Sequence, residues 1–242
     1  MSLGYVPRQR GAVVDKDALK RQAGEAAAAL VTDGMVVGLG TGSTVRFTID
    51  ALGRRVKEGL RIRGVPTSKA SEDQARRLGI PLTTLDDVAV VDLTIDGADE
   101  FDPQLRLIKG GGGALTREKV VAKASRRMVV VADASKQVEK LGSTFALPIE
   151  VIDLAKGPLL RRLAGLGADA KVRAAADGGA YRTDNGHLVV DARFARIDQP
   201  QELEQTLEAM PGVLACGLFL GLCDTVILGT PDGVRTVKAR LA

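Results

Sequence analysis

The chain has 242 residues, of which 45% are hydrophobic and 26% are charged. This length suffices for one large domain with a smaller companion, and the composition is that of an ordinary folded protein, neither disordered nor membrane-bound. The formal net charge is only +4 and aromatic residues make up 3% of the chain. These values argue against a strongly basic or aromatic nucleic-acid-binding surface and leave at most a mild preference for small anions.

No targeting or membrane segment is indicated. The amino-terminal stretch MSLGYVPRQRG has no apolar core of signal-peptide length, and no apolar run approaches the ~20 residues that a membrane span needs. Cys216 and Cys223 have no metal-ligand spacing, and the single histidine, His187, follows an Asn-Gly turn. We therefore expect a cytoplasmic protein with buried free thiols, a surface histidine, no zinc site and no histidine-based triad.

Strand and helix patterns alternate along the first 144 residues. The expected elements are a helix at 16–31, a strand at 35–39, a helix to about 56, a strand at 61–66, a loop at 67–71, a helix ending at 78–79, a strand at 88–95, a helix at 114–127 and a strand at 127–132. Repeated strand–helix units predict a Rossmann-like, doubly wound α/β fold. Its sheet should be mostly parallel, with right-handed crossovers and helices on both faces.

From about residue 145 the rhythm changes. The expected elements are a strand at 148–152, a helix at 157–166, a hairpin of 170–175 and 181–192 around Asp184-Asn185-Gly186, a helix at 200–210 and a strand at 213–220. This β-α-β-β-α-β order predicts a second, smaller ferredoxin-like α+β domain. Strand-like residues 224–237 should return to the first sheet. The predicted domains are therefore 1–144 plus about 221–242, and about 145–220.

Polar loops follow four of the predicted strands. Their sequences are GTGST, TSKAS, DGADE and ADASK. Ligands of open α/β sheets bind outside the carboxyl ends of the strands. The fold therefore predicts that these four loops, which are distant in sequence, meet at one rim and form an active site.

The first glycine loop, GLGTGST at 38–44, does not match two common nucleotide-binding motifs. It is not G-x-G-x-x-G, no acidic residue ends the next strand, and no lysine precedes Ser43-Thr44 as a P-loop requires. A strand-to-helix turn with free amides and three hydroxyls remains, which suits one phosphate or sugar hydroxyls. A turn kept only for tight packing is the alternative.

A second cluster of polar residues lies between 92 and 119. Asp96 and Asp99 follow a strand, Lys109 precedes the glycine run 110–113, and Glu118 falls in the first turn of the next helix. Each glycine would cost about 0.5–1 kcal/mol inside a helix or strand, so the run indicates a loop. The helix N-terminus should hold Glu118 ionised at neutral pH. This set fits acid–base chemistry on a small polar substrate, and a tight turn with solvated charges is the alternative.

Five motifs together resemble a known family. They are GLGTGST, PTSKASEDQARRLGIPL, DLTIDGADEFD, LIKGGGGALTREK and VADASKQVEKLG. In this order and spacing the chain resembles the A-type ribose-5-phosphate isomerases over nearly its whole length. The resemblance implies interconversion of D-ribose 5-phosphate and D-ribulose 5-phosphate in the non-oxidative pentose phosphate pathway, a lid-like second domain, no cofactor, and a homodimer or homotetramer. An amino-terminal extension of roughly a dozen residues departs from the family pattern.

The resemblance also implies the site. The substrate-binding residues would be Thr41, Gly42, Ser43, Thr44, Asp96, Gly97, Ala98, Asp99, Lys109, Gly110, Gly111, Gly112 and Lys136, with Glu118 as the catalytic base and no metal. Such an isomerase needs one carboxylate that reaches C1 and C2 and a cation or amides for the enediolate. Lys109 would stabilise the enediolate. Asp96 and Asp99 would bind hydroxyls and open the sugar ring, with their pKa values pushed apart, and which of them is the acid stays open.

Two other functions fit parts of the sequence. A sugar-phosphate-sensing domain without catalysis would be expected to carry a DNA-binding module, and too few residues precede Lys16 for a helix-turn-helix domain. A CoA transferase-like enzyme would use its glutamate as a nucleophile and should form a covalent thioester with acyl-CoA.

Overall fold

The computed structural model describes residues 15–238, so the predicted amino-terminal extension lies outside the described residues. The central sheet has the order β13-β12-β6-β3-β1-β2. Its strands are β1 (Val36–Leu39), β2 (Arg63–Pro66), β3 (Leu93–Asp96), β6 (Met128–Asp133), β12 (Thr225–Thr230) and β13 (Gly233–Lys238). All neighbouring pairs are parallel except β12 with β13. The predicted α/β fold with a mostly parallel sheet is confirmed.

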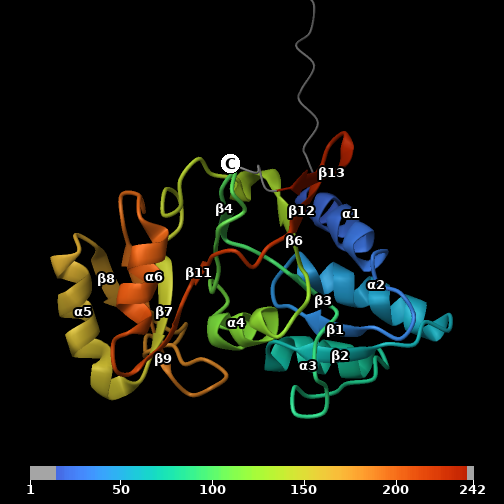
Figure 1. The fold of residues 1–242 in the computed structure, drawn as a ribbon, viewed down its shortest axis with the longest axis horizontal. Helices are drawn as coiled ribbons and strands as arrows, with labels where there is room; N and C mark the ends of the chain where they lie inside the picture. The colour runs from blue at the N-terminus through green and yellow to red at the C-terminus, as the bar shows by residue number, and fades with distance from the viewer. Residues whose placement is uncertain (1–14, 239–242) are drawn as a thin grey trace, which may run out of the picture.

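Both faces of this sheet are covered (Figure 1). Helices α1 (Lys16–Ala28), α2 (Val45–Lys57) and α3 (Lys69–Arg77) share one apolar core with alternate residues of β6, Val129 and Val131. The intervening residues of β6 belong to a core on the opposite face. That face carries α4 (Leu115–Lys123) and a small antiparallel sheet of β4 (Glu100–Phe101), β5 (Leu107–Ile108) and β11 (Leu218–Phe219). A strand buried on both faces needs this continuous apolar run.

A second sheet forms a smaller unit with its own core. Its strands are β7 (Leu147–Val151), β8 (Asp169–Val172), β9 (Leu188–Arg193) and β10 (Val213–Cys216), in the antiparallel order β10-β7-β9-β8. Helices α5 (Lys156–Gly165) and α6 (Pro200–Glu208) complete the predicted β-α-β-β-α-β pattern. Two short 3-10 helices, η1 (Ala134–Lys136) and η2 (Asp153–Ala155), follow β6 and β7. In Figure 1, α4 lies between the smaller unit and the parallel sheet. The exact domain limits remain a prediction.

The strand predicted at 213–220 is two strands in different sheets. β10 pairs with β7, whereas β11 pairs with β5. Gly217 separates them, and its N–H donates to the Pro148 carbonyl while its own carbonyl accepts from the Lys109 N–H at 2.9 Å. A Cβ at this position would overlap the Lys109 carbonyl. Only glycine allows this close approach, which fixes the backbone of Lys109.

The hairpin predicted from 170–175 and 181–192 is also different. Only β8 and β9 pair regularly, and residues 173–187 between them make two successive turns. Gly178 and Gly186 have φ angles of +85° and +86°, which permit these turns. We call residues 173–187 the double-turn segment.

Several helix boundaries differ from the sequence pattern, and the helix predicted at 16–31, for example, ends at Ala28. The predicted loop 67–71 is helical from Lys69, because the Ser68 side chain accepts from the Ser71 N–H in a capping box. The helix predicted at 114–127 ends at Lys123, and the nearby Ser125 hydroxyl donates to the Val121 carbonyl.

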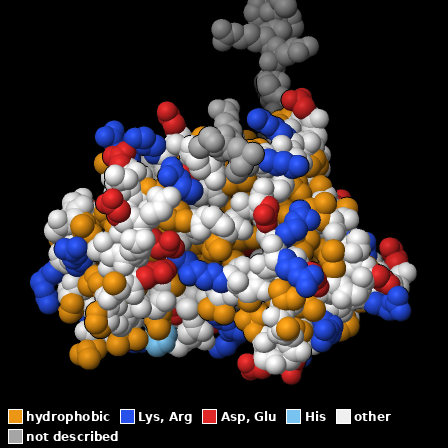
Figure 2. Space-filling model, viewed as in Figure 1, with side chains coloured by type: hydrophobic (Ala, Val, Ile, Leu, Met, Phe, Trp, Pro, Cys, Tyr) orange, Lys and Arg blue, Asp and Glu red, His pale blue; other side chains and the backbone are white. Residues whose placement is uncertain are grey.

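The charged surface and the two thiols follow the sequence predictions in part. Basic and acidic side chains are interspersed on the face shown in Figure 2, as the modest net charge suggests. Within residues 15–238 no helix is long and apolar enough to cross a membrane. Cys216 is a buried free thiol, as predicted, and Cys223 is a free thiol that is only partly buried. His187 is partly buried as well, not a fully exposed surface residue.

Candidate active site

A cavity of about 290 Å³ opens at the carboxyl ends of the parallel strands, as the topology predicts. The predicted site residues that line it are Thr41, Gly42, Ser43, Thr44, Gly97, Ala98, Asp99, Lys109, Gly110, Gly111, Gly112, Glu118 and Lys136. Asp96 is the exception, because it is fully buried and contacts Lys109. The fold therefore gathers all the predicted site residues, and their roles remain predictions.

The loop after β1 is held by the end of β3. The Asp96 Oδ1 atom accepts the N–H groups of Thr41 at 3.0 Å and of Gly97 at 2.7 Å. The Thr41 hydroxyl bonds to the side chains of Thr67 and Ser68. These two residues come from the TSKAS segment, which therefore supports the rim without lining the cavity. Thr44 makes no side-chain cap, and the N–H groups of the turn Gly42-Ser43-Thr44 have no acceptor among residues 15–238, so this turn is open to an anion.

A buried ion cluster lies on the floor of the cavity. The Lys109 ammonium donates to the Gly97 carbonyl at 2.6 Å. It also lies 3.1 Å from Asp96 Oδ2 and 3.3 Å from Glu118 Oε2. Neither of these carboxylate oxygens has a hydrogen bond of good geometry, although both are buried. Buried polar atoms that are left without hydrogen bonds are a frequent mark of a functional site.

The prediction that the helix N-terminus holds Glu118 ionised is wrong. Burial raises the pKa of Glu118, the charge of Asp96 raises it further, and the attraction of Lys109 does not fully compensate, so the pKa is about 8. Burial by itself would lower the pKa of Lys109, but the charges of Asp96 and Glu118 outweigh it and raise that pKa. The site therefore combines a permanently charged lysine with a carboxyl group that titrates near neutral pH, which suits a general base.

This pKa predicts a pH dependence. The value of kcat/KM should rise with pH between about 6 and 9 with a midpoint near 8, because only ionised Glu118 can accept a proton from the substrate. The substitution Asp96→Asn removes the charge that raises the Glu118 pKa but keeps an oxygen to accept the two N–H groups. The midpoint of the kcat/KM profile of this variant should therefore lie at a lower pH than that of the parent. Steady-state rates across this range test both points, and an unchanged midpoint in Asp96→Asn would contradict the assigned cause.

Asp99 has a different environment from Asp96. It is partly exposed, and its Oδ2 atom accepts the N–H of Gly111 at 2.7 Å. The carboxylate that shares Lys109 most closely with Asp96 is Glu118.

The sequence reasoning missed a cationic end of the cavity. Lys16 and Lys20 of α1 line it together with the predicted Lys136. Their spacing of four residues places them on one face of the helix. That face could not be assigned to the site because α1 precedes all the motifs, and only its packing against β6 and β12 brings it to the rim.

A larger hollow of about 1060 Å³ lies elsewhere, next to α3 and α4, and includes His187. It shares no lining residue with the strand-end cavity, and apolar side chains dominate its lining. Its chemistry does not resemble that of the strand-end cavity.

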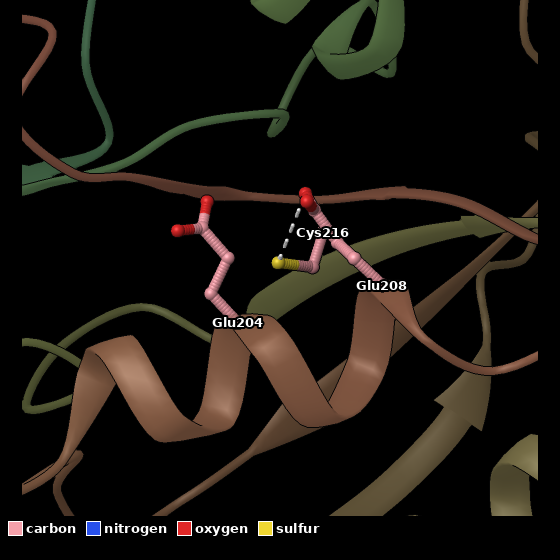
Figure 3. A group of neighbouring side chains, drawn as sticks. All are labelled: Glu204, Glu208 and Cys216. Atoms are coloured by element: carbon pink, nitrogen blue, oxygen red, sulfur yellow. Dashed lines mark hydrogen bonds between the residues drawn. The ribbon is translucent and has the colours of Figure 1, made fainter.

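One group of side chains among residues 15–238 has metal-like spacing. Figure 3 shows Glu204 and Glu208 of α6 pointing to the side where Cys216 of β10 lies. The Lys119 ammonium already contacts the two carboxylates at 2.8 and 2.6 Å. Burial raises the pKa of the Cys216 thiol to about 11, which disfavours the thiolate that binds metals. The two carboxylates are better explained as the ion-pair partners of the buried Lys119.

The strand-end cavity, with its titrating carboxyl, its buried lysine and its cationic end, has the features expected of an enzyme that transfers protons on a small anionic substrate. Residues 63–233 match the family model for ribose 5-phosphate isomerase A, also called phosphoriboisomerase A. The chain is 49% identical over 231 residues to ribose-5-phosphate isomerase A of Rhodopseudomonas palustris (strain HaA2), and the match covers 93% of this chain and 99% of that protein. The chain therefore belongs to the ribose 5-phosphate isomerase A family.

Solved structures agree with this assignment. The ribose 5-phosphate isomerase A of Methanocaldococcus jannaschii is similar with a TM-score of 0.88 and 42% identity, over 92% of this chain and 99% of that one. A D-ribose-5-phosphate isomerase in complex with phospho-erythronic acid is similar with a TM-score of 0.89 and 40% identity, over 92% and 98% of the two chains. The family resemblance of the sequence motifs is confirmed.

Proposed function

We propose that the protein interconverts D-ribose 5-phosphate and D-ribulose 5-phosphate by proton transfer through an enediolate. The observation that carries this proposal is the placement of Glu118 beside Lys109 on the floor of a strand-end cavity. Membership of the family supports the choice of substrate. A place in the non-oxidative pentose phosphate pathway follows from this reaction. A homodimer or homotetramer and a cytoplasmic location are further proposals.

The two ends of the cavity suit the two ends of the substrate. Lys16, Lys20 and Lys136 line the cavity together with the turn that begins α2. Lysine side chains and the free N–H groups of a turn before a helix both favour a phosphate. The phosphate would therefore lie at this end and place C1 and C2 near Glu118. The sequence left open which loop receives the phosphate, and the lysines support this end of the cavity.

Glu118 would remove the proton from C2 of the aldose and return it to C1, which requires one base that reaches both carbons. When Glu118 accepts the proton it loses its charge, while negative charge develops on the substrate oxygens. Lys109 lies next to Glu118, is almost fully buried, and would stabilise this new charge. The backbone amide of Gly112 would also be available, since glycine lets a ligand approach the backbone closely.

The direct test is to mix the purified protein with ribose 5-phosphate and to follow ketose formation. We expect ketose to accumulate to an equilibrium that is also reached from ribulose 5-phosphate. A protein that binds ribose 5-phosphate but forms no ketose would contradict the proposed catalysis and favour a sensor.

The proposed proton transfer needs no metal ion. We therefore predict that activity survives exhaustive treatment with EDTA, because a carboxylate base and a lysine supply the chemistry. Activity is measured before and after chelation, and again after adding back Mg²⁺, Mn²⁺ or Zn²⁺. Loss of activity that one of these ions restores would favour a metal-assisted hydride shift instead.

A further inference from the structure

Two side chains of the smaller unit hold the backbone of the glycine run. The Arg173 Nη1 atom donates to the carbonyls of Gly110 at 3.1 Å and Gly111 at 2.9 Å. The Tyr181 hydroxyl donates to the carbonyl of Gly112 at 3.1 Å. Three consecutive carbonyls are therefore bound from the double-turn segment. Neither Arg173 nor Tyr181 lines the cavity, so they contact the loop rather than a ligand.

Both side chains are themselves held in place. Arg173 binds Asp191 through Nε at 2.9 Å and Nη2 at 2.5 Å, a two-point contact that leaves Nη1 for the glycine carbonyls. The Tyr181 N–H donates to the Arg173 carbonyl at 2.8 Å, and the guanidinium lies 5.6 Å from the centre of the tyrosine ring. A Cβ at Gly113 would overlap the Tyr181 side chain, so the two segments pack directly.

Hydrogen bonds that fix a peptide carbonyl also fix the direction of the N–H group in the same peptide. In a planar trans peptide, the carbonyl of one residue and the N–H of the next point in opposite directions. Because Arg173 binds the carbonyls of Gly110 and Gly111, the N–H groups of Gly111 and Gly112 point away from the smaller unit. The Gly111 N–H meets Asp99, which lines the cavity. The Gly112 N–H has no acceptor among residues 15–238 and is free for a substrate oxygen.

We infer that Arg173 and Tyr181 are positioning residues for the isomerisation, and this inference rests on the proposed function of the cavity. Arg173 orients the Gly112 N–H for an enediolate oxygen through the Gly111 carbonyl, and Tyr181 restrains the same run through the Gly112 carbonyl. Glycine backbones have many accessible conformations, so the run needs an external restraint to hold this arrangement. The smaller unit thus takes part in catalysis through the loop, without touching the substrate.

The test compares Arg173→Lys and Tyr181→Phe with the parent protein. Phospho-erythronic acid carries a carboxylate whose negative charge imitates that of the enediolate, whereas ribitol 5-phosphate has the phosphate and hydroxyls but no such charge. A loop displaced by a fraction of an ångström should lower kcat by about tenfold to a hundredfold in Arg173→Lys and by about threefold to tenfold in Tyr181→Phe. The Kd of phospho-erythronic acid should rise by the same factors, while the Kd of ribitol 5-phosphate stays within about twofold.

Arg182→Lys is the matched control. Arg182 belongs to the same segment and also binds a carboxylate, Asp153, and a glycine carbonyl, that of Gly186, but it does not contact the glycine run. This variant should keep the parent's kcat and both Kd values within about twofold. Melting temperatures of all variants separate a loss of folding from a loss of positioning, and Tyr181→Phe, which lacks only one hydroxyl, decides the matter if Arg173→Lys does not fold.

Two results would overturn the inference. The first is that Arg173→Lys and Tyr181→Phe behave like Arg182→Lys in kcat and in the Kd of phospho-erythronic acid. The second is that the Kd values of both ligands rise equally, since this indicates a general distortion of the cavity. A parent protein without isomerase activity would contradict the proposed function instead. The positioning role would then be tested by the Kd values of the two ligands alone.

Discussion

Replacement of Glu118 by glutamine should lower kcat by a factor on the order of 10²–10⁴, as expected for the loss of a general base. Glutamine has almost the same shape, so the cavity and the binding of ribose 5-phosphate should persist. The measurement is kcat together with the Kd of the substrate for Glu118→Gln. Glu202→Gln, at an exposed position in α6, serves as the control and should retain parental activity. If kcat of Glu118→Gln stays within a few-fold of the parent value, the base lies elsewhere.

The same variant has a predictable stability. The pKa of Glu118 is raised from its ordinary value of 4.5 to about 8 in the folded protein. Between these values the unfolded chain has released the proton that the folded protein retains, so the parent loses stability as the pH rises. Glu118→Gln has no such group, so its melting temperature should equal or exceed that of the parent at pH 8. The melting temperature of Glu118→Gln minus that of the parent should therefore be larger at pH 8 than at pH 5. A smaller difference at pH 8 would contradict the raised pKa.

Replacement of Lys109 by methionine should lower kcat and kcat/KM together by about 10²–10³, the pattern of an interaction made in the transition state. The negative charge that Lys109 faces on the substrate develops only as the enediolate forms. Its ammonium lies among Asp96, Glu118 and the Gly97 carbonyl. The competing interpretation, that Lys109 holds the phosphate, predicts a raised KM with little change in kcat.

Lys20→Met provides the contrast for this experiment. Lys20 also lines the cavity, at the end proposed for the phosphate. It should bind the substrate and the transition state equally, so its loss should raise KM more than it lowers kcat. A pure KM effect in Lys109→Met would move Lys109 to the phosphate-binding residues.

Lys109→Met should also destabilise the fold, which the kinetic analysis must take into account. Removing one member of a buried ion cluster typically costs on the order of 3–5 kcal/mol, because the remaining charges lose their partner. Glu118 can become protonated, but Asp96 would stay buried beside an apolar side chain. Chemical denaturation measures this cost, and the folded fraction corrects kcat.

Much of the fold could be predicted from the sequence because its signals are local. The apolar run of β6 and the polar loops after β1 and β3 each lie within a few neighbouring residues. The β-α-β-β-α-β pattern of the smaller unit likewise depends on the order of its elements. Boundaries were less accurate where one residue decides them, as with the Ser68 cap of α3 or the Gly217 break between β10 and β11.

The sequence by itself determined which residues gather at the candidate site. Asp96, Asp99, Lys109 and Glu118 stand in recognisable motifs, and the order of strands brings them to one edge of the sheet. Residue identity and chain order are enough for this, because parallel strands share the edge at which their loops meet.

Only the tertiary structure decided the state of the site. The pKa of Glu118 depends on its burial and on the charge of Asp96, and neither can be read from its helix position. The cationic end depends on where α1 packs, and the restraint on the glycine run depends on Arg173, some 60 residues further along the chain. Burial and electrostatic contacts arise between segments that are distant in sequence, so they exist only once the fold has brought those segments together.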